Sequence, residues 1–291
     1  MSLLADRVSC LHEVLAHHGL SPAPVIVLGM HRSGTTMIAK LLETAGVFMG
    51  ARLSGNHEPR VFQDANRQIF DYFQTGWIAA ERVPSPKMLM NGFDGLCSDI
   101  ALRLTEDIPL CFCDARQAGT SGWGFKDPRT SVTAGLFLRL FPEASAIFVY
   151  RGAEDVAASI LKRELMIQNK YPDTTDITFE DHVSILMRAV KAWKVYNERA
   201  IAILPRFRRQ AFLRYEDVVG SPRLLLQQAF ARIGVEISDT AIESAGISAE
   251  RVGGGAEFAS LLEPMREYLA QSNVCFPPSL VFQEMSDKAY I

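Results

Sequence analysis

Long hydrophobic runs are missing from this sequence. None of its apolar stretches approaches the ~18–20 residues that a membrane-spanning helix requires. Residues 1–20 mix apolar residues with charges and histidines, so we expect neither a signal peptide nor a membrane anchor there. Cysteine is scarce as well: the five cysteines are odd in number and irregularly spaced, unlike a disulfide framework. We therefore expect a cytoplasmic protein with reduced thiols.

Metal-ligand spacings and a large excess of positive charge are also lacking. His17, His18 and His182 have no partners at ligand spacing, and Cys111 and Cys113 stand too close together for the usual metal or redox pair. The net charge is −3, whereas general nucleic-acid binding leaves a basic footprint. We expect no bound metal and no nucleic-acid partner. An anionic ligand must then rely on local positive groups.

Strand-like and helix-like segments alternate along the chain, without repeats or a Pro/Gly/Ser-rich linker. We expect strands over 24–29, 110–113, 123–126, 146–150 and 211–215. We expect helices over 3–18, 34–45, 65–81, 97–107, 129–140, 153–168, 178–204 and 221–233, with an irregular crossing over 48–64. This alternation predicts a single α/β domain over residues 1–291, with a mainly parallel central sheet flanked by helices.

A glycine-bearing turn joins the first predicted strand to the next helix. The apolar run Val25–Leu28 is followed by Gly29-Met30-His31-Arg32-Ser33-Gly34-Thr35-Thr36-Met37 and an amphipathic helix that a glycine ends at position 46. Backbone N–H groups converge at such a turn, and the helix dipole adds about half a positive charge. Glycine lets the backbone approach an oxyanion closely. The segment therefore predicts a phosphate-binding loop.

This loop lacks the lysine of nucleoside-triphosphate loops. Gly29 and Gly34 keep the spacing of G-x-x-x-x-G-K-[ST], but Thr35 stands in the lysine's place and the positive charge lies at Arg32. Such a site is poorly equipped to neutralise a γ-phosphate. It suits a single 5′-phosphate that carries a less charged group.

A second cationic position follows the predicted strand over 146–150. Arg151 leaves the carboxyl end of that strand, where open α/β sheets bind their ligands, and Ser159 lies about two helical turns farther on. A guanidinium fork suits a dianionic phosphate. The alternative is an ion pair of Arg151 with Glu154 or Asp155 at the start of the helix.

A third segment, Lys126-Asp127-Pro128-Arg129, closes a short predicted strand. Pro128 fits the first turn of the following helix, and Asp127 is expected to cap that helix. Lys126 and Arg129 are candidate functional cations. The alternative is a surface ion pair of Asp127 with one of them, which contributes at most ~1 kcal/mol.

Together these segments resemble the sulfotransferases that use 3′-phosphoadenosine 5′-phosphosulfate (PAPS). Their 5′-phosphosulfate loop reads [RK]-[ST]-G-T-[TS], and the arginine in first place resembles bacterial and Golgi-type members. The resemblance covers about residues 24–234. It implies the sulfotransferase version of the P-loop nucleotide-hydrolase fold, with residues 235–291 as an extension that packs on or caps the core.

The resemblance also implies an activity and residue roles. The activity is transfer of a sulfuryl group, without a metal, to a hydroxyl or an amine of a small-molecule, carbohydrate or lipid acceptor. Lys126 is implied to neutralise charge on the sulfuryl group, and Arg151 and Ser159 to bind the 3′-phosphate. The 5′-phosphosulfate is implied to contact Arg32, Ser33, Gly34, Thr35 and Thr36. Arg251, in the segment Arg251-Val252-Gly253-Gly254-Gly255, is a further candidate for binding the 3′-phosphate.

The acceptor base is expected within residues 55–64. Many related bacterial enzymes place a glutamate there in an [FW]-E-D segment, but this chain reads Phe62-Gln63-Asp64, and glutamine cannot act as a base. Glu58 is therefore the first candidate, with His57 and Asp64 as alternatives. The other interpretation is a polar loop in which Glu58 pairs with Arg60.

Two other functions stay open at this point. In an ATP- and Mg²⁺-dependent kinase, residues 108–114 would be a strand that ends in a metal-binding acid, although the missing loop lysine and Arg151 argue against it. A catalytically inactive nucleotide-binding protein would differ only in lacking the base. Residues Trp77 to Asp99, with two prolines and a glycine, are expected to form a mobile flap that shapes the acceptor pocket.

Overall fold

The centre of the molecule is a five-stranded parallel sheet in the order β2-β3-β1-β4-β5. The structure, a computed structural model, describes residues 2–112, 122–170, 178–245, 247, 266, 267 and 270. The strands are β1 (Val25–Leu28), β2 (Val47–Phe48), β3 (Gly122–Lys126), β4 (Ser145–Tyr150) and β5 (Arg209–Arg214). β1 lies between β3 and β4, so the turns that follow these three strands leave the same edge of the sheet.

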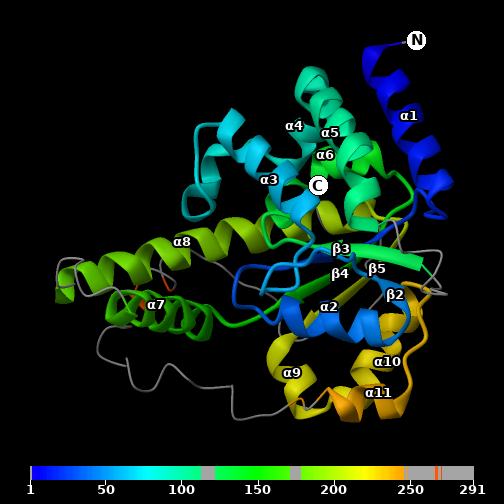
Figure 1. The fold of residues 1–291 in the computed structure, drawn as a ribbon. Helices are drawn as coiled ribbons and strands as arrows, with labels where there is room; N and C mark the ends of the chain where they lie inside the picture. The colour runs from blue at the N-terminus through cyan, green and yellow to red at the C-terminus, as the bar shows by residue number, and fades with distance from the viewer. Residues whose placement is uncertain are drawn as a thin grey trace.

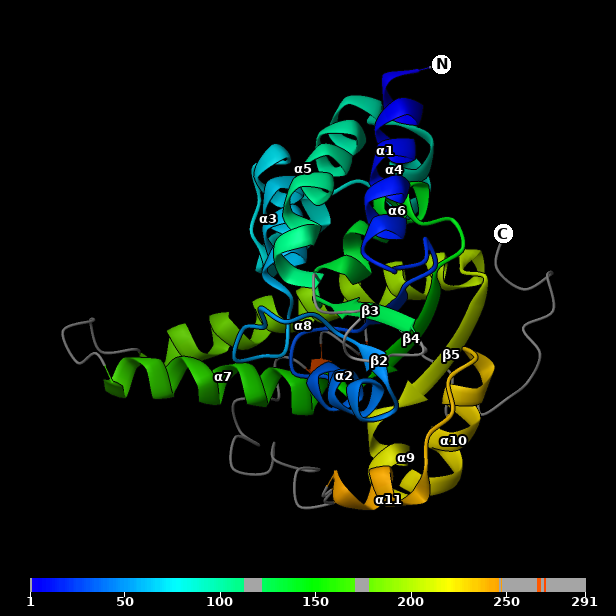
Figure 2. The same cartoon turned by 45° about the vertical axis from the view of Figure 1, so that its right-hand side comes forward.

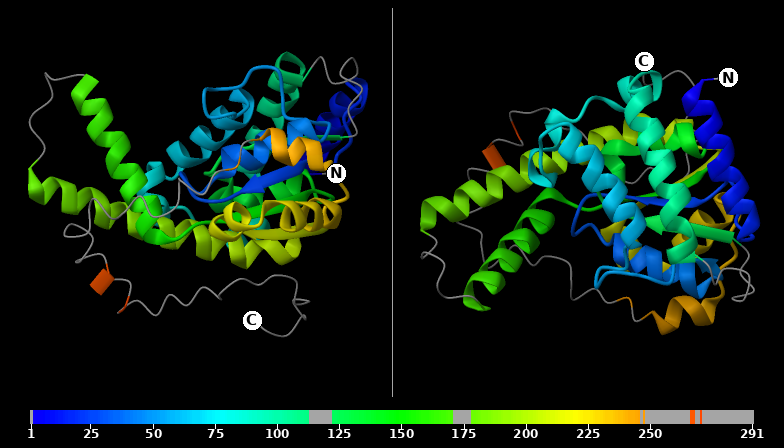
Figure 3. Two further views of the ribbon diagram at one scale, coloured as in Figure 1. Left: turned by 90° about the horizontal axis from the view of Figure 1, so that it is seen from below. Right: turned by 45° about the horizontal axis from the view of Figure 1, so that its top comes forward.

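Helices cover both faces of the sheet (Figure 1). Above it in Figures 1 and 2 lie α1 (Leu3–His17), α3 (Arg60–Tyr72), α4 (Pro86–Asn91), α5 (Asp94–Phe112) and α6 (Thr130–Leu140). Below it lie α2 (Thr35–Thr44), α9 (Tyr215–Gly220), α10 (Pro222–Arg232) and α11 (Asp239–Ser244). Helices α7 (Ala153–Lys170) and α8 (Phe179–Ile203) pack on each other and extend beyond the sheet (Figure 3), and the 3-10 helices are η1 (Trp77–Arg82) and η2 (Leu204–Arg206).

The central strands are apolar on both faces. Val25 and Val27 of β1 belong to the core under α2 and α10, whereas Ile26 and Leu28 belong to the core under α1, α3, α5, α6 and α8. A strand that is buried on both sides needs a continuous apolar run instead of an alternating one. The predicted α/β class with a mainly parallel sheet is confirmed, and four of the five predicted strands correspond to β1, β3, β4 and β5 within two residues at each end.

The predicted strand over 110–113 is wrong. Residues 110–112 form the last turn of α5, which runs through Pro109. The buried side chains Leu104, Ile108, Cys111 and Phe112 recur at helical spacing, while Leu110 is exposed. A short apolar run does not distinguish a strand from a buried helix. Residues 110–112 are helical because they continue the long helix that precedes them. The kinase hypothesis thereby loses the strand that it required.

The expected helix over 65–81 and the irregular flap after it also differ from the structure. Helix α3 begins at Arg60 and ends at Tyr72, so the irregular crossing is shorter than expected. The flap segment consists of η1, α4 and the start of α5. Ala80, Val83 and Leu89 in this segment are buried in the core, so it packs as part of the helical layer and not as a flap.

The C-terminal extension is described only in part. Helix α11 packs against α10 and α2. Most of residues 246–291, including Arg251, lie outside the described residues. In the part of the chain that the structure does describe, no helix has the length and apolar character needed to span a membrane.

Candidate active site

The turn after β1 has the backbone shape of an anion site. Gly29, Arg32 and Gly34 have φ angles of 149°, 69° and 92°. A Cβ at Gly29 would overlap the carbonyl oxygen of Val149, and a Cβ at Gly34 would overlap the ring of Tyr215. Both glycines are therefore required for the close packing of this turn.

The turn presents polar groups that the described residues leave unsatisfied. Ser33 is fully buried, and no described residue is a hydrogen-bond partner of its Oγ. Gly34 is the N-cap of α2 and has no side chain with which to cap the first amides of the helix. A buried hydroxyl without a partner costs ~1–3 kcal/mol. The turn is therefore suited to an anion that accepts hydrogen bonds.

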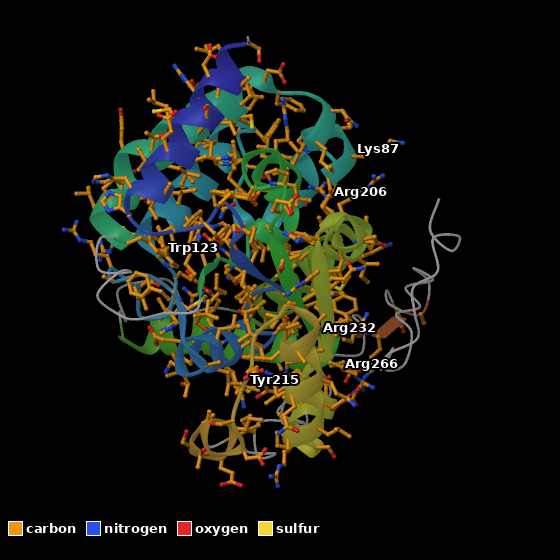
Figure 4. The ribbon with its side chains drawn as sticks, turned by 90° about the vertical axis from the view of Figure 1, so that its right-hand side faces the viewer. Lys87, Trp123, Arg206, Tyr215, Arg232 and Arg266 are labelled. Atoms are coloured by element: carbon orange, nitrogen blue, oxygen red, sulfur yellow. The ribbon has the colours of Figure 1, made fainter. Side chains whose placement is uncertain are left out.

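The second predicted segment meets this turn directly. Arg32 Nε donates to Ser159 Oγ at 2.9 Å, and Arg151 Nη1 donates to the carbonyl oxygen of Arg32 at 3.3 Å. The Arg151 guanidinium lies 4.7 Å from the centre of the ring of Tyr215, the first residue of α9, which is labelled in Figure 4. Arg151 Nη2 is also 3.5 Å from Asp155 Oδ2, so the ion pair considered from the sequence is present as well.

Arg163 is a positive residue at this place that the sequence motifs did not single out. It lies one turn after Ser159 on α7, and residues four apart share a helix face. Burial lowers the pKa of Arg32, and the nearby guanidinium groups of Arg163 and Arg151 lower it further. The four-residue spacing from Ser159 could have indicated from the sequence that Arg163 shares the helix face of Ser159.

Lys126 connects the turn, β3 and the segment before α3. Its Nζ donates to Glu58 Oε1 at 2.8 Å, to the Asn56 carbonyl at 2.5 Å and to Thr36 Oγ1 at 3.2 Å, so all three ammonium donors have acceptors. Lys126 is only 1% exposed. Burial lowers the pKa of Lys126, while the Glu58 carboxylate acts in the opposite direction.

Glu58, the first candidate for the base, is held through both carboxylate oxygens. Besides the contact of Lys126 with Oε1, the side-chain amide of Gln63 donates to Oε2 at 2.5 Å. Glu58 is 6% exposed and pairs with Lys126, not with Arg60 as the alternative interpretation required. A buried carboxylate and a buried ammonium thus form one hydrogen-bonded unit with a loop hydroxyl.

The two alternative bases have other partners. His57 has a φ of 62°, and its Nε2 lies 3.1 Å from Glu43 Oε2 on α2. Burial lowers the pKa of His57, and Glu43 opposes this effect. Asp64 pairs with Arg67 at 3.0 Å on α3.

Asp127 and Arg129 form an ion pair in which Asp127 is buried and Arg129 is partly buried, so it is not the surface pair considered from the sequence. Asp127 Oδ1 accepts a hydrogen bond from the Arg129 backbone N–H at 2.9 Å, and Oδ2 lies 2.6 Å from Arg129 Nη2. The carboxylate therefore holds the turn that enters α6. The N-cap of α6 is Arg129, not Asp127 as expected, and the helix has no side-chain cap hydrogen bond. Arg129 Nη2 also donates to the Gln63 carbonyl at 3.0 Å, which joins this turn to α3.

The ring of His31 contacts two aromatic rings, that of Trp77 on η1 and that of Tyr196 on α8. Its ring centre is 4.7 Å from that of Trp77 and 5.8 Å from that of Tyr196. Burial, followed by the positive charges of Arg129 and Lys126, lowers the pKa of His31 to about 3. His31 is therefore neutral near pH 7.

We expect His31 to make the protein sensitive to acid. The unfolded imidazole binds a proton below pH 6.5, whereas the folded one does so only near pH 3. The free energy of unfolding therefore falls as the pH drops below 6.5, and at pH 5 this effect is worth about 2 kcal/mol. In His31→Gln, the free energy of unfolding should fall by about 2 kcal/mol less between pH 7 and pH 5 than in the wild type, as measured by urea unfolding at both pH values. His17→Gln, at the exposed end of α1, is the control. Equal losses in the wild type and His31→Gln would refute this assignment.

Arg251 lies outside the described residues. Within the described ranges, no three His, Cys, Asp or Glu side chains are grouped so that they could hold a metal ion.

Comparison with known proteins identifies the family. The profile of the sulfotransferase family matches residues 24–239. Among solved structures, the sulfotransferase STF1 from Mycobacterium tuberculosis H37Rv is 14% identical with a TM-score of 0.50, and the match covers 88% of this chain and 80% of that one. No curated protein matches the sequence.

Two sulfotransferase domains are similar at lower TM-scores. The domain of the Synechococcus PCC 7002 olefin synthase is 19% identical with a TM-score of 0.47, and the match covers 89% of this chain and 90% of that one. The domain from the curacin biosynthetic pathway is 16% identical with a TM-score of 0.47, and the match covers 90% and 94%. Because the family profile spans well over half of the 291 residues, this chain belongs to the sulfotransferase family.

Proposed function

We propose that this sulfotransferase transfers the sulfuryl group of PAPS to an acceptor hydroxyl, or less readily to an amine, and releases adenosine 3′,5′-bisphosphate (PAP). The observation that carries the proposal is the contact of Lys126 with both Glu58 and Thr36. It brings a candidate base, a cation and the phosphate-binding loop into one unit. The acceptor is a small molecule, a carbohydrate or a lipid, and the irregularly spaced cysteines favour a cytoplasmic enzyme.

The residues of the loop fit the 5′-phosphosulfate end of the donor. The buried Ser33 hydroxyl and the uncapped start of α2 offer hydrogen bonds to an anion. Arg32 adds a positive charge to the same turn. These groups support the assignment of Arg32, Ser33, Gly34, Thr35 and Thr36 to the 5′-phosphosulfate.

The second cationic position fits the 3′-phosphate. Arg151 follows β4 and Ser159 lies on α7, yet both contact Arg32. Two anion sites next to each other match a nucleotide with phosphates at both its 5′ and its 3′ positions. The loop has no lysine at the position of Thr35, which argues against a γ-phosphate and its Mg²⁺.

The proposed chemistry is an in-line displacement at sulfur. Glu58 takes the proton of the acceptor hydroxyl as the new oxygen–sulfur bond forms. The bond between sulfur and the bridging oxygen breaks, and its electron pair stays on the 5′-phosphate. Lys126, Arg32 and the loop amides stabilise that charge, and donors of this kind contribute roughly 3–4 kcal/mol each.

We expect PAP to bind at least tenfold more tightly than ADP, and Arg151→Ala to remove most of that preference. A charge-assisted hydrogen bond contributes roughly 1.5–3 kcal/mol, which is about tenfold or more in affinity. Isothermal titration with each nucleotide, with and without Mg²⁺, measures both quantities. The control is Arg208→Ala, because Arg208 pairs with Glu143 at the surface, before β5.

Either of two results would contradict the 3′-phosphate assignment. One is equal binding of PAP and ADP by the wild type, and the other is an unchanged preference in Arg151→Ala. Tighter binding of ATP than of PAP that depends on Mg²⁺ would instead favour a kinase.

A further inference from the structure

We propose that Gln63 is a positioning residue for Glu58, whose carboxylate it holds in the orientation that proton transfer requires. This inference rests on the proposed function, because it takes Glu58 as the base. Gln63 was excluded from the candidate bases on its chemistry, and its contact in the structure suggests a different task. It is the neutral hydrogen-bond donor to one of the two oxygens of the base.

The contacts of Glu58 leave its carboxylate little rotational freedom. Gln63 Nε2 donates to Oε2 at 2.5 Å, and Lys126 Nζ donates to Oε1 at 2.8 Å. Glu58 is 6% exposed, so water has little access to replace either donor. Removing the Gln63 donor would leave one fixed oxygen and one free oxygen.

Gln63 is itself fixed from two sides. Its backbone N–H donates to the Pro59 carbonyl at 3.1 Å in the first turn of α3. Its carbonyl accepts a hydrogen bond from Arg129 Nη2 at 3.0 Å, and Arg129 is anchored by Asp127. The same segment, residues 126–129, thus supplies Lys126 to one oxygen of Glu58 and supports the donor to the other.

An amide suits this task better than a second acid. The Gln63 side chain donates an N–H but does not titrate. It can therefore neither give a proton to Glu58 nor take the acceptor's proton in place of Glu58. Two carboxyl groups at this distance would share one proton, as closely spaced like charges do. A proton shared by the two carboxyl groups would occupy the oxygen that must take the acceptor's proton.

The test separates positioning from mere packing. Gln63→Met keeps the length of the side chain and removes the donor, whereas Gln63→Glu replaces the donor by an acid. The matched control is Gln68→Met on the same helix, because Gln68 Oε1 accepts from Arg103 Nε at 2.6 Å, away from Glu58. The reaction is turnover of PAPS to PAP and sulfate with water as the acceptor, and PAP affinity and thermal unfolding are measured alongside.

We expect Gln63→Met to lower kcat by about 10- to 100-fold, because small displacements of a catalytic group have effects of this size. PAP affinity should stay within twofold, and Gln68→Met should keep the wild-type kcat. In Gln63→Glu the acidic limb of the kcat–pH profile should move to higher pH. The charged groups next to Glu58, namely Lys126, Asp127 and Arg129, are unchanged in every variant.

Three results would overturn the inference. The first is a kcat of Gln63→Met within twofold of the wild type. The second is a Gln63→Glu profile with an unmoved acidic limb. The third is a wild type that neither binds PAP nor turns over PAPS, which would overturn the proposed function together with the inference. Normal PAP binding in all variants, combined with either of the first two, would overturn the inference alone.

Discussion

Glu58→Gln is expected to lower kcat by ~10²–10⁴-fold, the range that a general base contributes. The amide keeps the shape of the side chain but cannot accept the acceptor's proton. Because PAP contacts are assigned to the loop and to Arg151, PAP affinity should change little. Turnover of PAPS and titration with PAP measure the two effects separately.

The substitution also leaves a buried ammonium without its carboxylate, so stability must be measured with activity. Breaking one side of a buried ion pair costs about 3–5 kcal/mol. Glu43→Gln is the matched control, since Glu43 contacts His57 and its side chain is 46% exposed. Near-full activity of Glu58→Gln would contradict the assignment. If His57→Ala or Asp64→Asn then lost activity, the role would belong to that residue.

The turn between β1 and α2 was predictable because its signal is contiguous. The strand, the glycines and the helix start follow one another from Val25 to Thr44, and each has a local cause in backbone geometry. The position of Arg151 was predictable for a similar reason, since it ends a fully apolar strand. The sequence also indicated that both segments lie at one edge of the sheet, since carboxyl ends of parallel strands share an edge.

The contacts between segments were not predictable from periodicity. Arg32 meets Ser159 across 127 residues, and Lys126 meets Glu58 across 68. The second contact depends on the turn before α3, where His57 has a positive φ that could not be predicted from its residue type. Gln63 was considered only as a base and excluded, and Arg163 lies outside the motifs. The contact of Gln63 with Glu58 and the position of Arg163 near Arg32 appear only in the folded chain.

The incorrect elements have one physical cause in common. Residues 110–112 and 77–99 contain prolines or short apolar runs, which local rules assign to strands or loops. Both segments became helical because helical spacing buries their apolar side chains against α1, α6 and α8. Tertiary burial therefore outweighed the local preference. Strand β2 was missed because two residues carry too little pattern.

Lys126→Met is expected to lower kcat by ~10²–10³-fold, the effect of removing one preorganised donor at a developing negative charge. PAP affinity should fall much less, because the contact strengthens as the bond to the 5′-phosphate breaks. Methionine fills a similar volume without charge, which limits the loss of packing at a residue that is 1% exposed. Steady-state turnover of PAPS and titration with PAP measure both quantities.

The double variant Lys126→Met/Glu58→Gln separates catalysis from stability. Each single change leaves one buried charge unpaired, whereas the double change removes both charges of the pair. The double variant should therefore regain much of the free energy of unfolding that the single variants lose, yet stay as inactive as the slower single variant. Urea unfolding and turnover of all four forms complete the cycle. A double variant that recovered activity along with stability would show that the Lys126–Glu58 pair supports the fold and does not act on the substrate.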